Sequence, residues 1–237
     1  MARTQHENDA FYHVYNRGTE GRDIFLDDTD RKRFLHYLYV ANDVIPVPKV
    51  LNPHAGEDVV RRARTRTTIV NILAHALMPN HFHLVLQQRV DGGVSKFMQK
   101  VGTGLTMYFN EKYKHKGVLL QGSFKSKPIE DEEYLARVVR YVHLNPVELF
   151  EPTWKEDGIK SRKGTIIFLR DFRWSSYQDY IGIKNYPSLL ARDIIEENLL
   201  LGKDHEEFVC ELLNEDNALG VLAIDNYGGL TSVVGSE

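Results

Sequence analysis

The chain has 237 residues, 42% of them hydrophobic, which suffices for one large globular domain or for a domain with an appendage. Its single cysteine, Cys210, excludes a disulfide framework and a thiolate zinc cage, and fits a reducing compartment. The N-terminal sequence lacks the apolar stretch of a signal peptide, and no window approaches the roughly 18 apolar residues of a membrane span. We therefore expect a cytoplasmic protein without membrane association.

The formal net charge of −3 hides an uneven distribution of the two signs along the chain. Residues 96–127 contain seven lysines and one acid, and residues 61–66 contain four arginines, whereas residues 186–237 contain eleven acids and two bases. A basic middle with an acidic tail favours contact between the middle and a polyanion. Charge alone is equally consistent with solvated lysines on the surface of a helix.

The N-terminal third of the chain contains one strand signal and one helix signal. A strand is predicted over residues 10–18, where aromatic and β-branched residues alternate and stop at a glycine. A helix is predicted over residues 27–43, where acids open the segment and apolar residues recur at helical spacing. Residues 45–65 are basic, contain proline and show no clear period, so we expect an excursion at the surface.

The middle of the chain contains two predicted strands before its second predicted helix. Residues 66–78 and 81–88 predict two strands that a short Pro-Asn break joins as a hairpin. A helix is expected over residues 94–113 and a strand within residues 117–129. Residues 130–145 predict a third helix, because four acids occur at its start and the proline that follows disfavours helix in the residue before it.

This order of elements predicts an α+β fold of the split βαβ kind, ferredoxin-like or RRM-like, with helices packed on an antiparallel sheet. Residues 155–165 read as a polar loop, followed by short acidic helices at about 188–201 and 204–214. We expect residues 1–150 to form the catalytic domain and residues 151–237 to form a small helical extension on the same core.

Two histidines interrupt the apolar run "MPNHFHLVL", residues 78–86. Because side chains alternate along a strand, His81 and His83 share one face while the residues between and after them form an apolar face. Two imidazoles at this spacing are close enough to bind one divalent cation, although a site needs at least one further ligand. Exposed or structurally hydrogen-bonded histidines remain an alternative.

The third helix offers the missing groups. Tyr141 and Asn145 are four residues apart and therefore lie on one helical face. A phenol one turn before an amide combines a nucleophilic oxygen with an oxygen ligand suited to a hard cation. Tyr134 extends the same stripe and is expected to pack on the sheet.

Five motifs in this order carry a family resemblance: "YHVYNRG", "HALMPNHFHLVL", "GVLLQGSFKSKPI", "YVHLNPV" and "WSSYQDYIG". Together they resemble the single-tyrosine transposases of the His-hydrophobic-His (HUH) endonuclease superfamily, in particular the REP-associated tyrosine transposases. The resemblance covers about residues 10–182. It implies a metal-dependent enzyme that cleaves and rejoins single-stranded DNA.

The resemblance implies a role for each matching residue. His81 and His83 correspond to the family's paired metal ligands, Tyr141 to its nucleophile, and Asn145 to a further ligand of the metal. The metal is Mg²⁺ or Mn²⁺ in the family. Attack by the tyrosine links it to the 5'-phosphate and leaves a free 3'-hydroxyl, so rejoining needs no ATP.

The predicted DNA-binding surface consists of polar and basic side chains from two of these motifs and of Arg140 just before a third, and Phe124 beside them is expected either in the core or stacked on a base. These residues are Asn16, Arg17, Gln121, Lys125, Lys127 and Arg140. The expected partner is single-stranded or hairpin DNA. The family contains both monomers and homodimers, and the sequence does not decide between them.

Two other functions are compatible with the same residues. One is a domesticated protein that binds repeats or hairpins without cutting them. The other is a metal-dependent hydrolase that activates water and uses His75 as an additional ligand, although a hydrogen-bonded structural histidine is the commoner role for such a residue.

Overall fold

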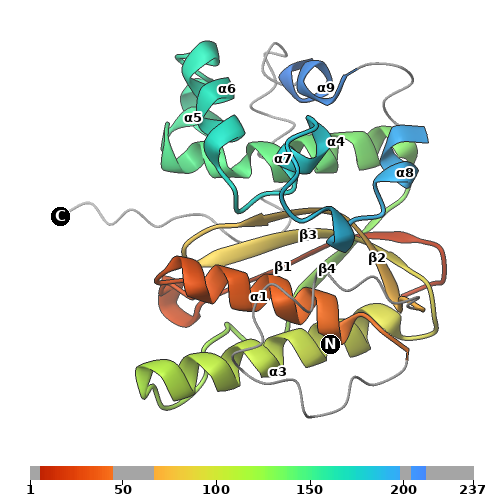
Figure 1. The fold of residues 1–237 in the computed structure, drawn as a ribbon, viewed down its shortest axis with the longest axis vertical. Coiled ribbons are helices and arrows are strands. Elements are labelled where there is room, and N and C mark those ends of the chain that lie inside the picture. The colour runs from red at the N-terminus through yellow and green to blue at the C-terminus, as the bar shows by residue number, and fades with distance from the viewer. Residues whose placement is uncertain (1–5, 45–66, 198–203, 212–237) are drawn as a thin grey trace.

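The computed structural model describes residues 6–44, 67–197 and 204–211. Its centre is an antiparallel sheet in the order β2-β3-β1-β4, made of β1 (Phe11–Arg17), β2 (Val70–Leu77), β3 (His81–Gln88) and β4 (Lys125–Ile129). Figure 1 shows α1 (Asp28–Ala41) and α3 (Gly93–Tyr113) on one side of the sheet and α4 (Glu132–Leu144) on the other. The predicted α+β fold with a split βαβ plan is therefore confirmed.

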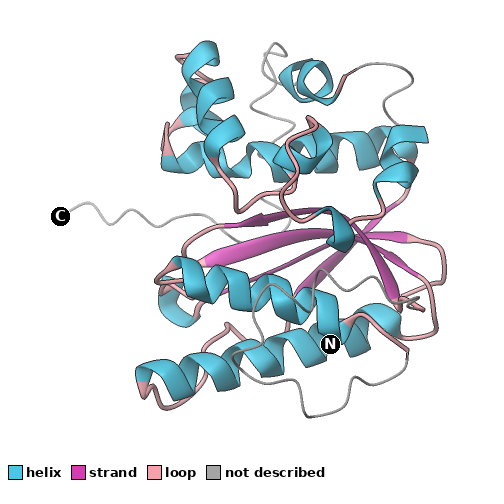
Figure 2. Cartoon of the chain, viewed as in Figure 1, coloured by secondary structure: helices cyan, strands magenta, loops and turns pink. Residues whose placement is uncertain are grey.

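Short helices build a second layer on the α4 side, as Figures 1 and 2 show. These are η2 (Asn145–Leu149), α5 (Trp154–Asp157), α6 (Arg162–Asp171), α7 (Tyr177–Tyr180), α8 (Arg192–Ile195) and α9 (His205–Glu211). Two other short turns lie elsewhere: η1 (Thr19–Gly21) follows β1, and η3 (Pro187–Leu189) packs Leu189 into the core with α1 and α3. None of the helices in the described part of the chain has the length and hydropathy that crossing a membrane requires. The boundary expected near residue 150 stays a prediction.

Both faces of the sheet are buried, each beneath a separate hydrophobic core. Phe82, Leu84 and Leu86 of β3 pack with α1 and α3, as the apolar alternation predicted. Val85, on the histidine face of the same strand, packs instead with α4 and the helices above it. The two histidines of β3 therefore lie beneath a helix.

Two predicted elements differ clearly from the observed ones. The loop expected over residues 155–165 is wrong at both ends, because α5 runs to Asp157 and α6 begins at Arg162, where Ser161 accepts a hydrogen bond from the Gly164 N–H and caps the helix. The strand within residues 117–129 is confined to β4, since Gly117 and Gly122 adopt positive φ in the loop before it. These glycines break the extended conformation that the apolar residues suggested.

The end of α4 departs from expectation only in detail. Asn145 keeps helical backbone angles and begins η2, with Pro146 in the first turn, where its missing N–H needs no acceptor. In the C-terminal region α8 and α9 are shorter than the expected helices, and residues 198–203 and 212–214 lie outside the described residues. The excursion expected at residues 45–65 also falls outside them.

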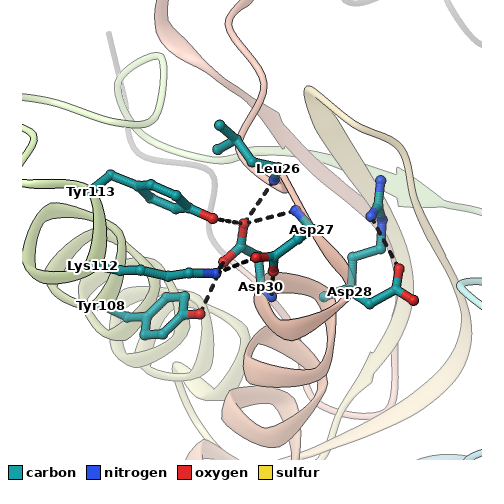
Figure 3. Close-up of polar contacts among 8 residues, drawn as sticks. Leu26, Asp27, Asp28, Asp30, Tyr108, Lys112 and Tyr113 are labelled. Carbon is teal, nitrogen blue, oxygen red and sulfur yellow. Dashed lines mark hydrogen bonds and ion pairs between the residues drawn. The ribbon is translucent and has the colours of Figure 1, made fainter.

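Asp30 ties α1 to the C-terminal end of α3 (Figure 3). Its carboxylate is fully buried and accepts from the Leu26 N–H (2.8 Å), the Asp27 N–H (3.2 Å), the Tyr108 hydroxyl (2.9 Å), the Tyr113 hydroxyl (2.8 Å) and the Lys112 ammonium (2.7 Å). Burial lowers the pKa of Lys112, but hydrogen bonds to Asp27 and Asp30 outweigh it and hold that pKa above its usual value. The buried charge is thus fully compensated.

Replacing Asp30 by asparagine is expected to lower the free energy of unfolding by about 3 kcal/mol, because the donors around this buried group lose a carboxylate acceptor and Lys112 keeps only Asp27 as an acidic partner. Urea unfolding measures the change. The neighbouring Asp28→Asn is a matched control, since the Asp28 side chain is 66% exposed and its pair with Arg31 spans 3.7 Å. We expect less than about 1 kcal/mol from the control, and equal losses would contradict the structural role of Asp30.

A buried chain of polar groups joins α9 to α4. The two ring nitrogens of His143 lie 2.7 Å from Ser176 Oγ and 2.8 Å from His205 Nε2. Burial lowers the pKa of His205 to about 3 and that of His75 to about 4. Burial also lowers the pKa of His143, and the neighbouring His205 and His75 lower it further. All three rings are therefore neutral in the folded protein at neutral pH.

These histidines predict a loss of stability in mild acid. A histidine with a depressed pKa stabilises the fold above about pH 6.5, and this contribution is lost as the pH falls toward its folded-state value. Each such ring is expected to cost about 2 kcal/mol of unfolding free energy between pH 7.5 and pH 5.0. Urea unfolding at the two pH values measures the loss, which should be smaller in His205→Gln. An identical loss in that variant would rule out the contribution of His205.

Candidate active site

The face of the sheet under α4 carries a row of polar side chains across three strands. Residues opposite each other on neighbouring strands share a face. Tyr15 of β1 is paired with His83 on one side and with Lys125 on the other, and His13 is paired with Lys127. The predicted metal ligand His83 and the two predicted DNA-binding lysines of β4 therefore lie on the same face.

His81 and His83 are brought together as the strand alternation predicted. Their ring centroids are 5.0 Å apart and their planes are nearly perpendicular. His81 Nδ1 lies 2.6 Å from Asn80 Oδ1, while Asn80 Nδ2 donates to the Gly21 carbonyl. An amide oxygen only accepts, so Nδ1 donates, and in a neutral His81 the lone pair lies on Nε2.

The C-terminal end of α4 supplies the other half of the site. Tyr141 is fully buried, and its hydroxyl accepts a hydrogen bond of 3.1 Å from Asn145 Nδ2. The other amide atom, Asn145 Oδ1, lies 3.2 Å from His81 Nε2. The Tyr141 ring also meets His83 edge-on, with 5.4 Å between centroids. The structure therefore brings the four residues predicted for catalysis and metal binding into one cluster.

The donor atoms of this cluster fit a divalent cation. In a neutral His81 both Nε2 and Asn145 Oδ1 are acceptors, and two acceptors facing each other gain from a cation between them. Two ligands with bonds of about 2.1 Å at right angles would be about 3.0 Å apart, close to the observed separation of 3.2 Å. Imidazole nitrogen and amide oxygen suit Mn²⁺, and the oxygen also suits Mg²⁺.

The donor set is nevertheless small. In the described ranges, which omit 45–66 among others, no group of three or more His, Cys, Asp or Glu side chains could hold a metal ion. His75 does not join the pair, because it is opposite Leu84, whereas Ala76 is opposite His83. Two imidazoles and one amide would leave most positions around a cation to water or to a substrate oxygen.

His13 is part of the cluster, although sequence reasoning did not select it. Its Nε2 lies 2.9 Å from His83 Nδ1, and its ring is edge-on to Tyr141 at 5.9 Å between centroids. A group that hydrogen-bonds one ring nitrogen of a metal-binding histidine fixes the orientation of the other. The alternation within "YHVYNRG" places His13 and Tyr15 on one face, but only the strand register brings His13 to His83.

His83 is held in its neutral form. Burial lowers its pKa well below the usual value, and the charges of His81, His13, Lys155 and Lys127 lower it further. A neutral imidazole keeps a lone pair, which metal binding requires.

Lys155 is a second residue that sequence reasoning missed, because it stands in a segment read as a polar loop. Its ammonium lies 5.6 Å from the centroid of the Tyr141 ring and forms an ion pair of 3.1 Å with Glu148. It comes from α5, in the region expected to be an extension. A positive charge at this place favours anionic groups beside the phenol.

The six predicted DNA-binding residues do not form a single patch. Arg17 Nε donates to Gln121 at the end of the sheet that carries His81. Asn16 is buried, points to the opposite face, and donates to the Gly122 carbonyl at 3.3 Å. Arg140 packs its guanidinium 4.2 Å from the ring centroid of Phe208 in α9, away from the cluster. The sequence alone does not show that α9 covers the face of α4 on which Arg140 lies.

Comparisons with known proteins locate the similarity in the same region. Residues 57–145 match the family model described as "Transposase IS200 like". No curated protein matches the chain significantly. Among solved structures, a REP-associated tyrosine transposase bound to a REP hairpin is similar, with a TM-score of 0.49, 16% identity and coverage of 81% of this chain and 90% of that chain.

A second solved structure is a bacterial tRNA(His) guanylyltransferase (Thg1)-like protein in complex with ATP, with a TM-score of 0.36, 9% identity and coverage of 78% and 77%. The family match includes the strand with both histidines and the helix with Tyr141, and it ends at Asn145. It leaves out β1, with His13, and α5, with Lys155.

Proposed function

We propose that this chain, whose residues 57–145 match the IS200-like transposase model, cleaves and rejoins single-stranded DNA with Tyr141 as its nucleophile. One observation carries the proposal: the Tyr141 hydroxyl, the Asn145 amide and His81 are linked by contacts of 3.1 and 3.2 Å on one face of the sheet. These contacts support the proposal, because the oxygen that would attack lies next to the Asn145 and His81 atoms that would bind a cation.

The residues that would hold a divalent ion are His81, His83 and Asn145, with His13 orienting His83. When bound, Mg²⁺ or Mn²⁺ would withdraw charge from the scissile phosphate, which a phenol with an ordinary pKa near 10 needs in order to react at neutral pH. Tyr141 Oη forms a bond to phosphorus and loses its proton, while the bond from phosphorus to the 3'-oxygen breaks and that oxygen gains a proton. The reverse step rejoins the strand.

The remaining polar residues of this face would position the substrate. Lys125 and Lys127 point to the same side as His83 and are suited to phosphate contacts. Arg17 donates a hydrogen bond to Gln121 at the end of the sheet beside His81. Single-stranded DNA next to a hairpin is the substrate we propose, since cleavage by a buried tyrosine needs a flexible strand that enters between α4 and the sheet.

The assignment is tested by incubating the full chain with end-labelled hairpin DNA and Mn²⁺ and separating the products on a denaturing gel. A covalent protein-DNA adduct, mapped to Tyr141 by mass spectrometry, is the expected result. Binding without modification would favour the domesticated, non-cleaving alternative. A free 5'-phosphate product without adduct would favour a hydrolase that activates water, and either outcome would overturn the tyrosine mechanism.

A further inference from the structure

A cavity of about 550 Å³ lies on the other face of the sheet from the histidines. It is bounded by α3, by the end of β1 and by the segment that leads into β4. Met98 and Gly102 line it from α3, Asn16 from β1, and Phe124 from the segment before β4. Its volume falls within the range of about 300–1,000 Å³ that is usual for small-molecule sites.

The lining of the cavity is neutral and partly aromatic. Among its lining residues in the described part of the chain there is no Asp, Glu, Lys or Arg. The rings of Phe124 and His6 both face it, with 6.2 Å between centroids and 25° between planes, and the thioethers of Met98 and Met107 add polarizable surface. The Asn16 amide adds polar hydrogen-bonding groups. This is the chemistry that recognises a flat, uncharged ring with polar edges.

Only the edge strand β4 separates the cavity from the lysines of the proposed DNA-binding face. Along β4, Lys125 and Lys127 point to the histidine face, while Ser126 points to the cavity. The segment before β4 also contacts both faces of the sheet. Gln121 contacts Arg17 on the histidine face, while the Gly122 carbonyl accepts a hydrogen bond from Asn16 on the cavity face. Charged groups suited to phosphates and neutral groups suited to a base are thus separated by the edge of one sheet.

We propose that this cavity binds one unstacked nucleobase of the single-stranded DNA whose phosphates lie along Lys125 and Lys127. The inference rests on the proposed function, because it assigns the cavity to the same substrate. Stacking on an aromatic side chain tolerates any base and strengthens binding of single strands. The DNA then passes over the β4 edge, with its backbone on the histidine face and one base on the other.

Gly102 allows the cavity to be filled from within α3. A Cβ at this position would lie 3.7 Å from Leu120 Cδ1, an ordinary contact, so the helix accepts a side chain there. Gly102→Phe should occupy the cavity, and Phe124→Leu should remove the aromatic surface while keeping an apolar side chain. Gly102→Ala is the folding control, and its thermal midpoint is expected to equal or exceed that of wild type because alanine favours helix over glycine.

The test compares two fluorescent probes of equal length and charge, (dT)20 and a 20-mer of abasic deoxyribose phosphates, in EDTA so that no cleavage occurs. We expect wild type to bind (dT)20 at least about tenfold more tightly than the abasic probe. In Gly102→Phe and Phe124→Leu this preference should fall at least about fivefold, while affinity for the abasic probe stays within about twofold.

Two outcomes would overturn the inference: equal binding of both probes by wild type, or an unchanged preference in both variants. Because this assay measures binding alone, it is independent of the adduct assay. An adduct on Tyr141 with an unchanged base preference would refute the base subsite and leave the proposed function intact. A lost preference without any adduct would support the subsite and refute the tyrosine mechanism.

Discussion

Tyr141→Phe is expected to abolish DNA cleavage, with a loss of at least about 10³-fold in the rate of adduct formation, while DNA binding stays within about twofold. The substitution removes only the hydroxyl oxygen that would bond to phosphorus. The fold should tolerate the change, because the ring keeps its packing and the hydroxyl gives up a neutral hydrogen bond of 3.1 Å from Asn145. Loss of such a bond costs about 1 kcal/mol.

Tyr134→Phe provides a matched control for that result. Tyr134 belongs to the same helix, is partly buried beside the same core, and loses the same atom. It should cleave at a rate close to that of wild type. If Tyr141→Phe still formed the adduct at the wild-type rate, the nucleophile would have to be another residue, and the proposed mechanism would be wrong.

The sequence predicted the part of the site that depends on local geometry. His81 and His83 share a face because strands alternate, and Tyr141 and Asn145 share a face because helices repeat about every four residues. The helix was proposed as the source of the missing groups from its residue types, and the family resemblance supported that pairing; residues 57–145 match the IS200-like transposase model. The roles assigned to these four side chains stay predictions.

The parts that the sequence did not predict depend on distant contacts. His13 reaches His83 only through the register of β1 against β3, and a shift of one residue would turn it to the other face. Lys155 reaches Tyr141 because α5 folds back after η2. The polar sequence around Lys155 contains no local pattern that predicts this return. Arg140 was expected to bind DNA, yet its helical face is covered by Phe208 of α9.

His81→Ala is expected to weaken Mn²⁺ binding at least about 100-fold and to remove Mn²⁺-dependent cleavage, because one of only two imidazoles of the proposed site is lost. Electron paramagnetic resonance titration of free Mn²⁺ measures binding without relying on activity. The fold should be retained, since His81 is only partly buried and stands at the start of β3. His115→Ala serves as a control at a histidine outside the cluster that contacts Arg22 at the surface.

Asn145→Asp tests the same site in the opposite direction. A carboxylate in place of the amide oxygen that lies 3.2 Å from His81 Nε2 would add a negative charge beside the two imidazoles. Hard divalent cations prefer charged oxygen ligands, so Mn²⁺ affinity should rise about tenfold or more. Asn145→Ala should lower it instead. If the aspartate and alanine variants shifted Mn²⁺ affinity equally, or if cleavage by wild type persisted in excess EDTA, the metal assignment would be wrong. Asn145 would then serve to hydrogen-bond Tyr141, and His81 to contact Asn145.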